Sequence, residues 1–244
     1  MLSVVIVTRN ESLAIRDVLT SVVRTLSTIS SAPAGRHEIV LVDDSDDLST
    51  VEAAREALSS ETGIALNLIH RTPQERDGLT GAILHGLRVS ANEQVIVMDG
   101  DGQHPTDMLV NLANQLTNSS VVFASRYIHI NGDAGLSHAI RRVASRTINR
   151  FLIGTLGKYI CCTDPLSGFF AVDKRAVTLP STSHGGWKAG FLILTHNLAD
   201  RRAQLKYSEV GFSIAPRLAG ESKLSLRTSF RILWELRCAA RMIA

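Results

Sequence analysis

The chain has 244 residues, of which 45% are hydrophobic and 20% charged, and its formal net charge is +3. This composition excludes an intrinsically disordered chain, because it holds enough apolar side chains to bury a sizeable core. The three cysteines are Cys161, Cys162 and Cys238. An odd number with two adjacent does not make a disulfide framework, so we expect a reducing compartment.

The chain opens on an apolar segment, "LSVVIVT", with no basic region or cleavage site before it. We therefore expect no signal peptide. No run of about 18 uncharged apolar residues occurs, so no helix within these residues is expected to span a bilayer.

Strand-like and helix-like segments alternate in the first half. Runs of β-branched and other apolar residues predict strands at 3–8, 37–45, 65–71 and 93–101. Apolar residues at helical spacing predict helices at 11–26, 49–60 and 78–91. The alternation is typical of parallel strands joined by right-handed crossovers, which predicts an α/β fold.

The first two predicted helices carry further signals. In the first, five apolar residues share one face and are expected to be buried: Leu13, Val18, Leu19, Val22 and Leu26. The second is expected to open with a serine or threonine cap, with Glu52 in its first turn.

The second half is less regular. Its patterns predict strands at 121–127, within 164–177 and at 204–216, a long basic helix at 135–157 and a closing helix at 229–244. We find no internal repeat, low-complexity tract or linker in the sequence. These features indicate one domain that spans 1–244.

Charged residues end three of the predicted parallel strands. Asp43 and Asp44 end the second strand, and Asp99 and Asp101 end the fourth, while Arg71 ends the third. Parallel strands bring their carboxyl ends to one rim of the sheet, where ligands bind in such folds. The functional residues are therefore expected to collect at this rim.

The segment "VIVMDGDGQHPTD" places two carboxylates two residues apart. Asp99 and Asp101 repel each other unless a cation lies between them, and Gln103 adds an amide oxygen. Hard oxygen ligands favour Mg²⁺ or Mn²⁺, which also bridge phosphates. The alternative is that the residues after the strand only start the next helix, with Thr106 or Asp107 as its cap.

A series of motifs runs in order along nearly the whole chain: "VIVTRNE", "VLVDDSDD", "HRTPQERDGLTGAILHG", "MDGDGQHP", "SRY", "DPLSGFF" and "RLAGESKLS". The series resembles the inverting nucleotide-sugar glycosyltransferases of family 2, and among them the polyprenyl-phosphate (dolichol-phosphate) mannose synthases. The resemblance implies a single GT-A domain with a Rossmann-like, mixed but mainly parallel sheet flanked by helices. It also implies a nucleotide-sugar-binding half at 1–104 and an acceptor-binding half at 105–244 that ends in an amphipathic helix.

The implied reaction is inverting, metal-dependent transfer of mannose from GDP-mannose to a polyprenyl (dolichyl) monophosphate. Asp99, Asp101 and Gln103 would hold Mg²⁺ or Mn²⁺ on the diphosphate of the donor, and His104 is expected to orient this motif. The resemblance assigns the nucleotide sugar to Thr8, Arg9, Asn10, Glu11, Asp43, Asp44, Arg71, Gly78, Asp99, Gly100, Asp101 and Lys223.

A lipid monophosphate is already an anion, so its attack on the sugar needs cations that align it rather than a general base. By resemblance, the phosphates of acceptor and donor bind to Arg126, Arg141 and Arg217, with Ser145 one turn from Arg141. These three arginines and Asp101 form the implied catalytic set.

The sequence departs from the family at four places, one of which is the spacing of its acidic segment "DDSDD". Ala219 stands where a second arginine is common, and Val7 and Arg9 stand where proline and tyrosine are common. Family members often carry an acidic residue in the helix before the last strand. The corresponding segment "GFLILTHNL" has none.

Two basic stripes predict contact with an anionic membrane surface. Arg142, Arg146 and Arg150 recur every four residues in the long basic helix. In the closing helix and the two residues before it, one side gathers Arg227, Phe230, Arg231, Trp234, Arg237 and Arg241. Its aliphatic side is expected to pack on the domain or on a membrane-anchoring partner. We therefore expect a cytoplasmic protein, peripheral at the cytoplasmic face of a membrane; the alternative is that these arginines meet only water.

Aromatic residues make up only 5% of the chain and form no base-stacking platform, so nucleic acid is not an expected partner. Two other functions stay open. One is transfer from a UDP-sugar to undecaprenyl phosphate. The other is non-catalytic binding of a nucleotide sugar or lipid phosphate, against which the intact D-x-D-x-Q motif argues, because a binder needs no metal for a leaving group.

Overall fold

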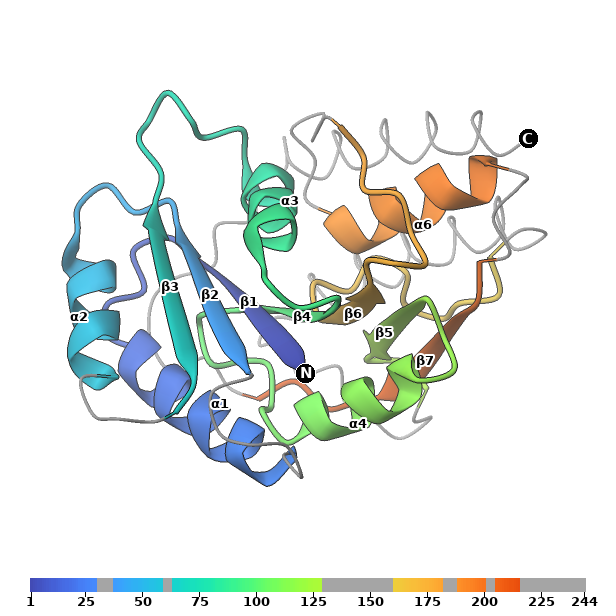
Figure 1. Cartoon of the computed structure of the whole chain (residues 1–244), viewed down its shortest axis with the longest axis horizontal. Coiled ribbons are helices and arrows are strands. Elements are labelled where there is room, and N and C mark those ends of the chain that lie inside the picture. Colours follow the sequence, from blue (N-terminus) through green and yellow to red (C-terminus); the bar gives the residue numbers. More distant parts are fainter. Residues whose placement is uncertain (30–36, 59–62, 129–159, 182–187, 201–204, 216–244) are drawn as a thin grey trace, which may run out of the picture.

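The computed structural model describes residues 1–29, 37–58, 63–128, 160–181, 188–200 and 205–215. In this part of the chain, seven strands form one sheet in the order β3-β2-β1-β4-β6-β5-β7 (Figure 1). The strands are β1 (Leu2–Thr8), β2 (Glu38–Asp43), β3 (Ala65–His70), β4 (Gln94–Asp99), β5 (Val121–Ser125), β6 (Phe170–Asp173) and β7 (Tyr207–Gly211).

Strand direction confirms the predicted fold class. The first four strands pair in parallel, as their alternation with helices predicted. β6 runs antiparallel to both β4 and β5, and β7 lies parallel to β5 at the far edge. The sheet is therefore mixed but mainly parallel, within one α/β domain.

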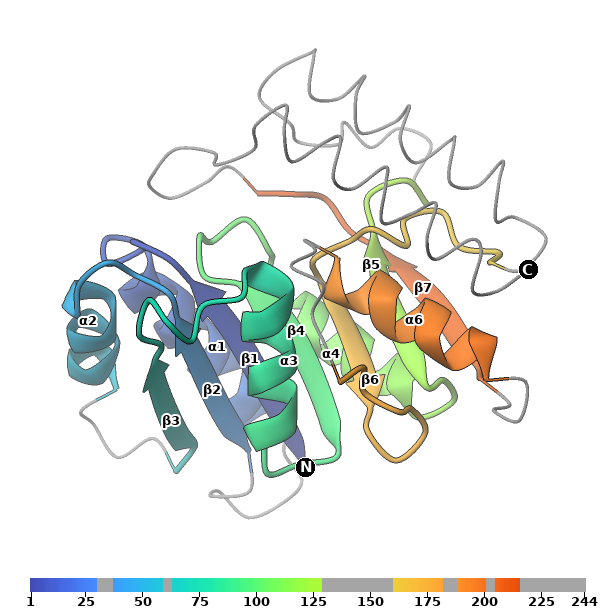
Figure 2. The ribbon, with the colours of Figure 1, turned by 90° about the horizontal axis from the view of Figure 1, so that it is seen from above.

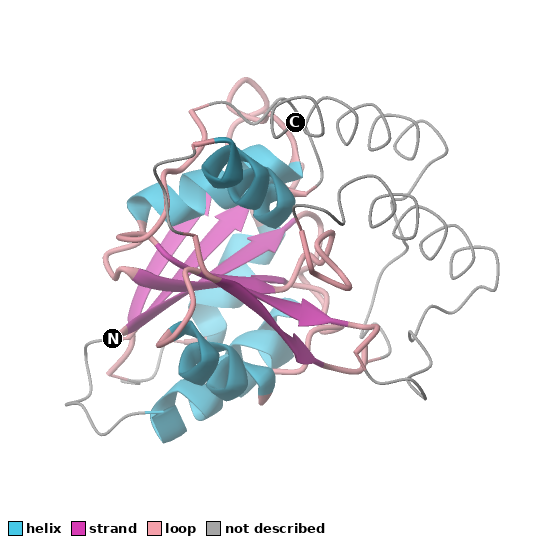
Figure 3. Cartoon of the chain, turned by 90° about the vertical axis from the view of Figure 1, so that its right-hand side faces the viewer, coloured by secondary structure: helices cyan, strands magenta, loops and turns pink. Residues whose placement is uncertain are grey.

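Helices cover both faces of the sheet (Figures 1 and 3). They are α1 (Ile15–Ile29), α2 (Ser49–Ala57), α3 (Leu79–Val89), α4 (Met108–Leu116) and α6 (Ala189–Ala199). α3 and α6 pack on one face with Val5 and Val7, and α1, α2 and α4 pack on the other with Val4 and Ile6. Burial on both sides explains why β1 reads as a continuous apolar run.

Two details of the predicted helices are wrong. α1 begins at Ile15 and not at residue 11, so Leu13 lies before the helix and is 81% exposed, while Val18 and Leu19 are buried as expected. α2 has Leu48 at its N-cap position and no side-chain cap. The carboxylate of Asp47 instead accepts hydrogen bonds from the backbone N–H and the hydroxyl of Ser49.

The predicted helices at 135–157 and 229–244, with their basic stripes, lie outside the described residues. None of the helices that the structure describes combines the length and apolar character needed to cross a membrane. Cys161 and Cys162 are both free thiols, and Cys238 lies outside the described part.

The order in which strands are added to the sheet reverses between β1 and β4, although the two strands are parallel. From β1 the chain proceeds outward through α1, β2, α2 and β3, and α3 then returns it across the opposite face to β4, on the other side of β1 (Figure 2). In open α/β sheets, ligands bind beyond the carboxyl ends of the strands at such a reversal. Thr8 and Asp99 end the two strands at this point.

Candidate active site

Three strand ends are joined by the buried carboxylate of Asp43. Thr8, Asp43 and His70 lie side by side in register on β1, β2 and β3. Asp43 Oδ1 accepts a hydrogen bond from Thr8 Oγ1 at 2.8 Å, and Asp43 Oδ2 lies 2.9 Å from His70 Nδ1. The Ser45 hydroxyl also donates to Asp43. Asp43 is fully buried. Its carboxylate therefore has a structural role, which is to hold these strand ends together.

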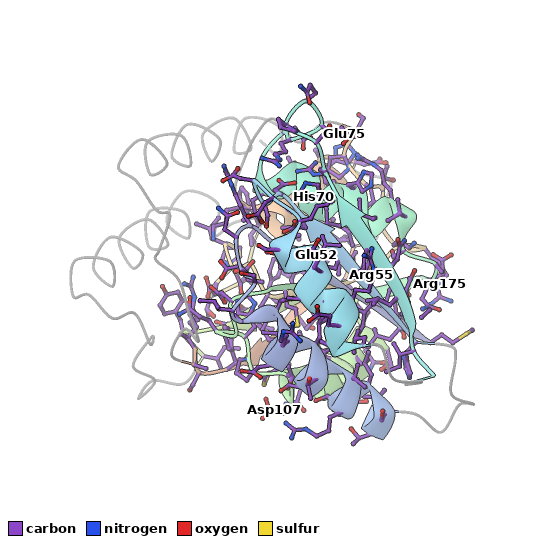
Figure 4. The ribbon with its side chains drawn as sticks, turned by 90° about the vertical axis from the view of Figure 1, so that its left-hand side faces the viewer. Glu52, Arg55, His70, Glu75, Asp107 and Arg175 are labelled. Carbon is purple, nitrogen blue, oxygen red and sulfur yellow. The ribbon has the colours of Figure 1, made fainter. Side chains whose placement is uncertain are left out.

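Arg71 connects the end of β2 to the loop that enters α3. Its Nε and Nη2 each lie 2.7 Å from an oxygen of Asp44, and its Nη1 lies 2.8 Å from Asp77 Oδ1. Nη2 also donates to the carbonyl of Gly78. Burial disfavours the charged form, but the hydrogen bonds to Asp44 and Asp77 outweigh it and raise the pKa of Arg71. Figure 4 shows this region, with His70 at the end of β3 and Glu75 on the loop above it.

Glycine is required where this loop meets α3. A Cβ at Gly81 would come 1.6 Å from Asp77 Oδ1, so any larger residue would displace the carboxylate that binds Arg71. Gly78 itself has a φ of 90°, a conformation that favours glycine. The predicted site residues Asp44, Arg71 and Gly78 therefore belong to one network.

The loop after β1 is fastened to the loop after β2. The Asn10 amide donates to Asp46 Oδ2 at 3.1 Å, and the Asp46 backbone N–H donates back to Asn10 Oδ1 at 3.1 Å. Arg9 reaches Asp46 Oδ1 at 3.6 Å, and the Glu11 backbone N–H donates to Thr50 Oγ1. Asn10 has a φ of 56°, which asparagine tolerates better than most residues. The structure thus brings the predicted residues from Thr8 to Glu11 against the segment that runs from Asp43 to Thr50.

The D-x-D motif begins at Asp99, the last residue of β4, beside the end of β1. The Gly100 backbone N–H donates to the Val7 carbonyl at 3.0 Å, and a Cβ at Gly100 would come 2.3 Å from Thr8 Cγ2. Only glycine allows this approach. Asp101 is 5% exposed, and its Oδ1 accepts from the Gln103 backbone N–H at 3.0 Å. The tight turn therefore holds both carboxylates at the rim.

His104 holds this turn in its orientation. Its Nδ1 accepts the Asp99 backbone N–H at 3.0 Å, while its Nε2 lies 3.9 Å from Asp99 Oδ2. The ring stacks on Phe169 at 4.7 Å between centroids. Burial lowers the pKa of His104, so the ring is neutral and carries its proton on Nε2, facing Asp99. This geometry agrees with the expected orienting role.

The donor set at this turn fits a hard divalent cation. Asp99 and Asp101 supply carboxylates, and Gln103 supplies an amide. The described residues contain no group of three or more His, Cys, Asp or Glu side chains placed to hold a metal ion. Water or a phosphate would therefore have to supply ligands. Of the two residues that could instead cap the next helix, Asp107 stands at the N-cap position of α4 and makes no side-chain cap.

Arg126 is held rigidly beside this motif. Its Nε and Nη2 lie 2.7 and 2.8 Å from the two oxygens of Asp164, and its backbone N–H also donates to Asp164. Burial disfavours the charged form, but pairing with Asp164 raises the pKa of Arg126 above its ordinary value. A Cβ on Gly168 would lie 3.6 Å from Asp99 Oδ2. The 164–168 turn thus joins Arg126 to the D-x-D motif.

Two residues that the sequence interpretation missed support this arrangement. Glu209 on β7 accepts the backbone N–H groups of Thr163 and Asp164 at 2.7 and 2.8 Å, which fixes the turn that carries Asp164. Lys188 lies half-buried before α6, where the charges of Arg126, Asp164 and Asp99 act on it. The available signal was a lysine at the start of a helix, where acidic residues are favoured.

Four predicted site residues lie outside the described residues: Arg141, Ser145, Arg217 and Lys223. Ala215, the last described residue before Arg217 and Lys223, is hydrogen-bonded to Gln103 of the metal motif. The Ala215 backbone N–H donates to the Gln103 carbonyl at 3.0 Å, and the Gln103 amide donates back to the Ala215 carbonyl at 3.5 Å.

Residues 3–177 match the model of the family described as "Glycosyl transferase family 2". The chain is 30% identical over 239 residues to a dolichol-phosphate mannosyltransferase of Mycosarcoma maydis, covering 96% of this chain and 77% of that protein. It is 31% identical over 237 residues to a protein of the same name from Pyrococcus furiosus, covering 95% of this chain but only 61% of that protein.

Among solved structures, glucosyl-3-phosphoglycerate synthase from Mycobacterium tuberculosis, in complex with Mg²⁺ and UDP, is similar with a TM-score of 0.65 and 19% identity. The match covers 99% of this chain and 79% of that one, and at this identity it shows the fold alone. Fold, motif order and family match agree: the chain is a glycosyltransferase of the GT-A fold and belongs to glycosyl transferase family 2.

Proposed function

We propose that this protein transfers mannose from GDP-mannose to a polyprenyl (dolichyl) monophosphate, with inversion, at the cytoplasmic face of a membrane. The observation that carries the proposal is the position of Arg126, paired with Asp164, next to the D-x-D motif. A site with carboxylates on one side and a fixed guanidinium on the other suits two phosphate substrates. The two relatives named dolichol-phosphate mannosyltransferase support this choice of substrates.

The donor side of the site is the rim at β1, β2 and β4. Asp99, Asp101 and Gln103 would hold Mg²⁺ or Mn²⁺, which when bound would offset the negative charge of the departing nucleoside diphosphate. The turn at Gly100 keeps the two carboxylates fixed, and neutral His104 keeps Asp99 in place. The nucleotide would lie over the loops that Asn10 and Arg71 hold.

The acceptor side requires positioning rather than proton removal. A phosphate monoester is anionic at neutral pH, so no general base has to act on it. Asp164 binds Nε and Nη2 of Arg126 and so fixes the plane of the guanidinium, and Nη1 takes no part in that pair. A planar, preorganised cation loses little entropy when it binds a phosphate oxygen.

The direct test is transfer of label into lipid. The protein would be incubated with Mn²⁺, a polyprenyl phosphate and labelled GDP-mannose, and in parallel with labelled UDP-glucose. Mannose label in the lipid phase is expected. Label from UDP-glucose would establish the alternative donor, and binding of both substrates without any transfer would establish a non-catalytic binder.

The choice of nucleotide predicts a difference in thermal stability. GDP with Mn²⁺ should raise the melting temperature more than UDP with Mn²⁺ does, because a ligand that binds only the folded state stabilises it by about 2.7 kcal/mol at a hundred times its Kd. Differential scanning fluorimetry at equal nucleotide concentrations measures this difference. A larger shift with UDP would contradict GDP-mannose as the donor.

Membrane association predicts binding that depends on salt. The closing helix at 229–244 lies outside the described residues, so the prediction rests on its sequence. The protein should sediment with anionic liposomes at low salt and be released at high salt, because each arginine near the surface contributes about 1 kcal/mol. Changing Arg231, Arg237 and Arg241 together to glutamate should weaken this binding. Unchanged sedimentation of that variant would contradict the predicted membrane face.

A further inference from the structure

Lys188 lies at the start of α6, where this helix packs closely on the sheet. It stands directly before Ala189, the first residue of α6, and Ala189 is buried. At Gly190, a Cβ would come 2.9 Å from the ring of Phe123 and 3.0 Å from the ring of Phe170. These phenylalanines belong to β5 and β6, so the start of α6 lies as close to the sheet as a glycine permits. The position of Lys188 is therefore set by the core.

The neighbours of Lys188 are the charged groups of the proposed transfer site. Among nearby charges, that of Arg126 has the largest effect on the pKa of Lys188, followed by those of Asp164 and Asp99. Its own charge acts on His104, which holds Asp99. These groups come from the ends of β4 and β5 and from the 164–168 turn. Lys188 thus belongs to the region between the D-x-D motif and the Arg126–Asp164 pair.

The position is unfavourable for a lysine on three counts. The side chain is half-buried, a second cation lies nearby, and the start of a helix carries partial positive charge. Burial, and next the charge of Arg126, lower the pKa of Lys188 to about 8. Asp164 already binds Arg126 with both oxygens, and the Lys188 ammonium makes no hydrogen bond or ion pair with any residue that the structure describes. A half-buried ammonium beside a second cation, with no direct partner among the described residues, points to an anionic ligand.

We propose that Lys188 binds substrate phosphate, and that its ammonium contacts the monophosphate of the lipid acceptor beside Arg126. This inference rests on the proposed function and assigns a further residue to the acceptor side. The acceptor is favoured over the donor diphosphate because α6 begins against Phe123 of β5, the strand that ends directly before Arg126.

The test measures substrate binding without turnover. Calorimetry would give the Kd of citronellyl phosphate, a short soluble polyprenyl phosphate, and separately the Kd of GDP with Mn²⁺. Lys188→Met and Lys188→Gln remove the charge in an apolar and a polar form, so a folding defect of one does not decide the result. Lys206→Met is the control, because Lys206 is exposed and directly precedes β7. Both Lys188 variants should raise the Kd of citronellyl phosphate on the order of 10- to 100-fold, as loss of a hydrogen bond to a charged group does.

The two dissociation constants distinguish the proposed role of Lys188 from its alternatives. The Kd of GDP with Mn²⁺ should be unchanged in both variants, and Lys206→Met should change neither constant. An unchanged Kd of citronellyl phosphate in both Lys188 variants would overturn the proposal, and so would an equal loss in Lys206→Met. Weaker GDP binding with unchanged citronellyl phosphate binding would overturn the assignment to the acceptor. If the wild-type protein binds both ligands but transfers no sugar, the proposed function fails while a role of Lys188 in phosphate binding still stands.

Discussion

Replacing Asp101 with asparagine should lower the rate of sugar transfer on the order of 10²- to 10⁴-fold, the range that corresponds to several kcal/mol of lost metal-assisted stabilisation. Asparagine keeps the shape of the side chain, and its oxygen can still accept the Gln103 backbone N–H that Asp101 accepts at 3.0 Å. What is lost is the negative charge that holds a divalent cation. The free energy of unfolding should change by no more than about 1 kcal/mol, because the hydrogen bond of the turn is kept.

The matched control is Asp107→Asn, which removes a nearby carboxylate outside the predicted ligand set. Asp107 is exposed and makes no side-chain cap on α4, so this variant should transfer sugar at the wild-type rate (Figure 4). Removal of the metal from the wild-type protein with EDTA should abolish transfer, and excess Mn²⁺ should restore it. Wild-type activity of Asp101→Asn in excess Mn²⁺ would show that the metal assignment is wrong.

Replacing Asp164 with asparagine should destabilise the protein by about 3–5 kcal/mol, the cost of breaking a buried ion pair by removing one partner. Asp164 is fully buried, and its two oxygens bind Nε and Nη2 of Arg126 and the Arg126 backbone N–H. An asparagine would place an N–H₂ group against a guanidinium that has no acceptor in exchange. Transfer should be lost as well, because the plane of the guanidinium is no longer fixed.

A second variant separates the two effects. Combining Arg126→Met with Asp164→Asn removes the uncompensated charge, so the double variant should recover part of the free energy of unfolding that Asp164→Asn loses. Transfer should stay as low as in the single variant, because the proposed phosphate cation is absent. Urea unfolding and the lipid transfer assay give the two readouts. Recovered transfer in the double variant would show that Arg126 does not bind the acceptor, and wild-type stability of Asp164→Asn would contradict the structural role of the pair.

Much of the candidate site was predictable because its signals are local. The apolar runs before Asp43 and Asp99 identify strands, and their alternation with helices makes the strands parallel. Parallel strands necessarily end on one rim, so two acidic strand ends far apart in the sequence had to meet. The structure confirms that Thr8, Asp43 and Asp99 end neighbouring strands of the same sheet.

Partners of the charged groups were not predictable from the sequence. Asp43, Asp44 and Arg71 look alike as polar residues at strand ends, but in the structure Asp43 joins three strands and Arg71 joins Asp44 to Asp77. Which partner a carboxylate takes depends on distances between segments that no spacing rule contains. Glu209 and Lys188 were missed for the same reason. Glu209 meets the 160–168 segment only because β7 packs beside it, and Lys188 meets Arg126 and Asp164 only because of where α6 begins.

By itself, the sequence determined the fold class, the parallel half of the sheet, the rim on which the acids lie and the family, because periodicity and motif order are properties of contiguous residues. Only the tertiary structure decided that β6 enters antiparallel between β4 and β5, and that Arg126 is fixed by Asp164 beside the D-x-D motif. These features arise from contacts between segments far apart in the chain. Their stability depends on burial and on the pairing of charges, which exist only after the layers have packed.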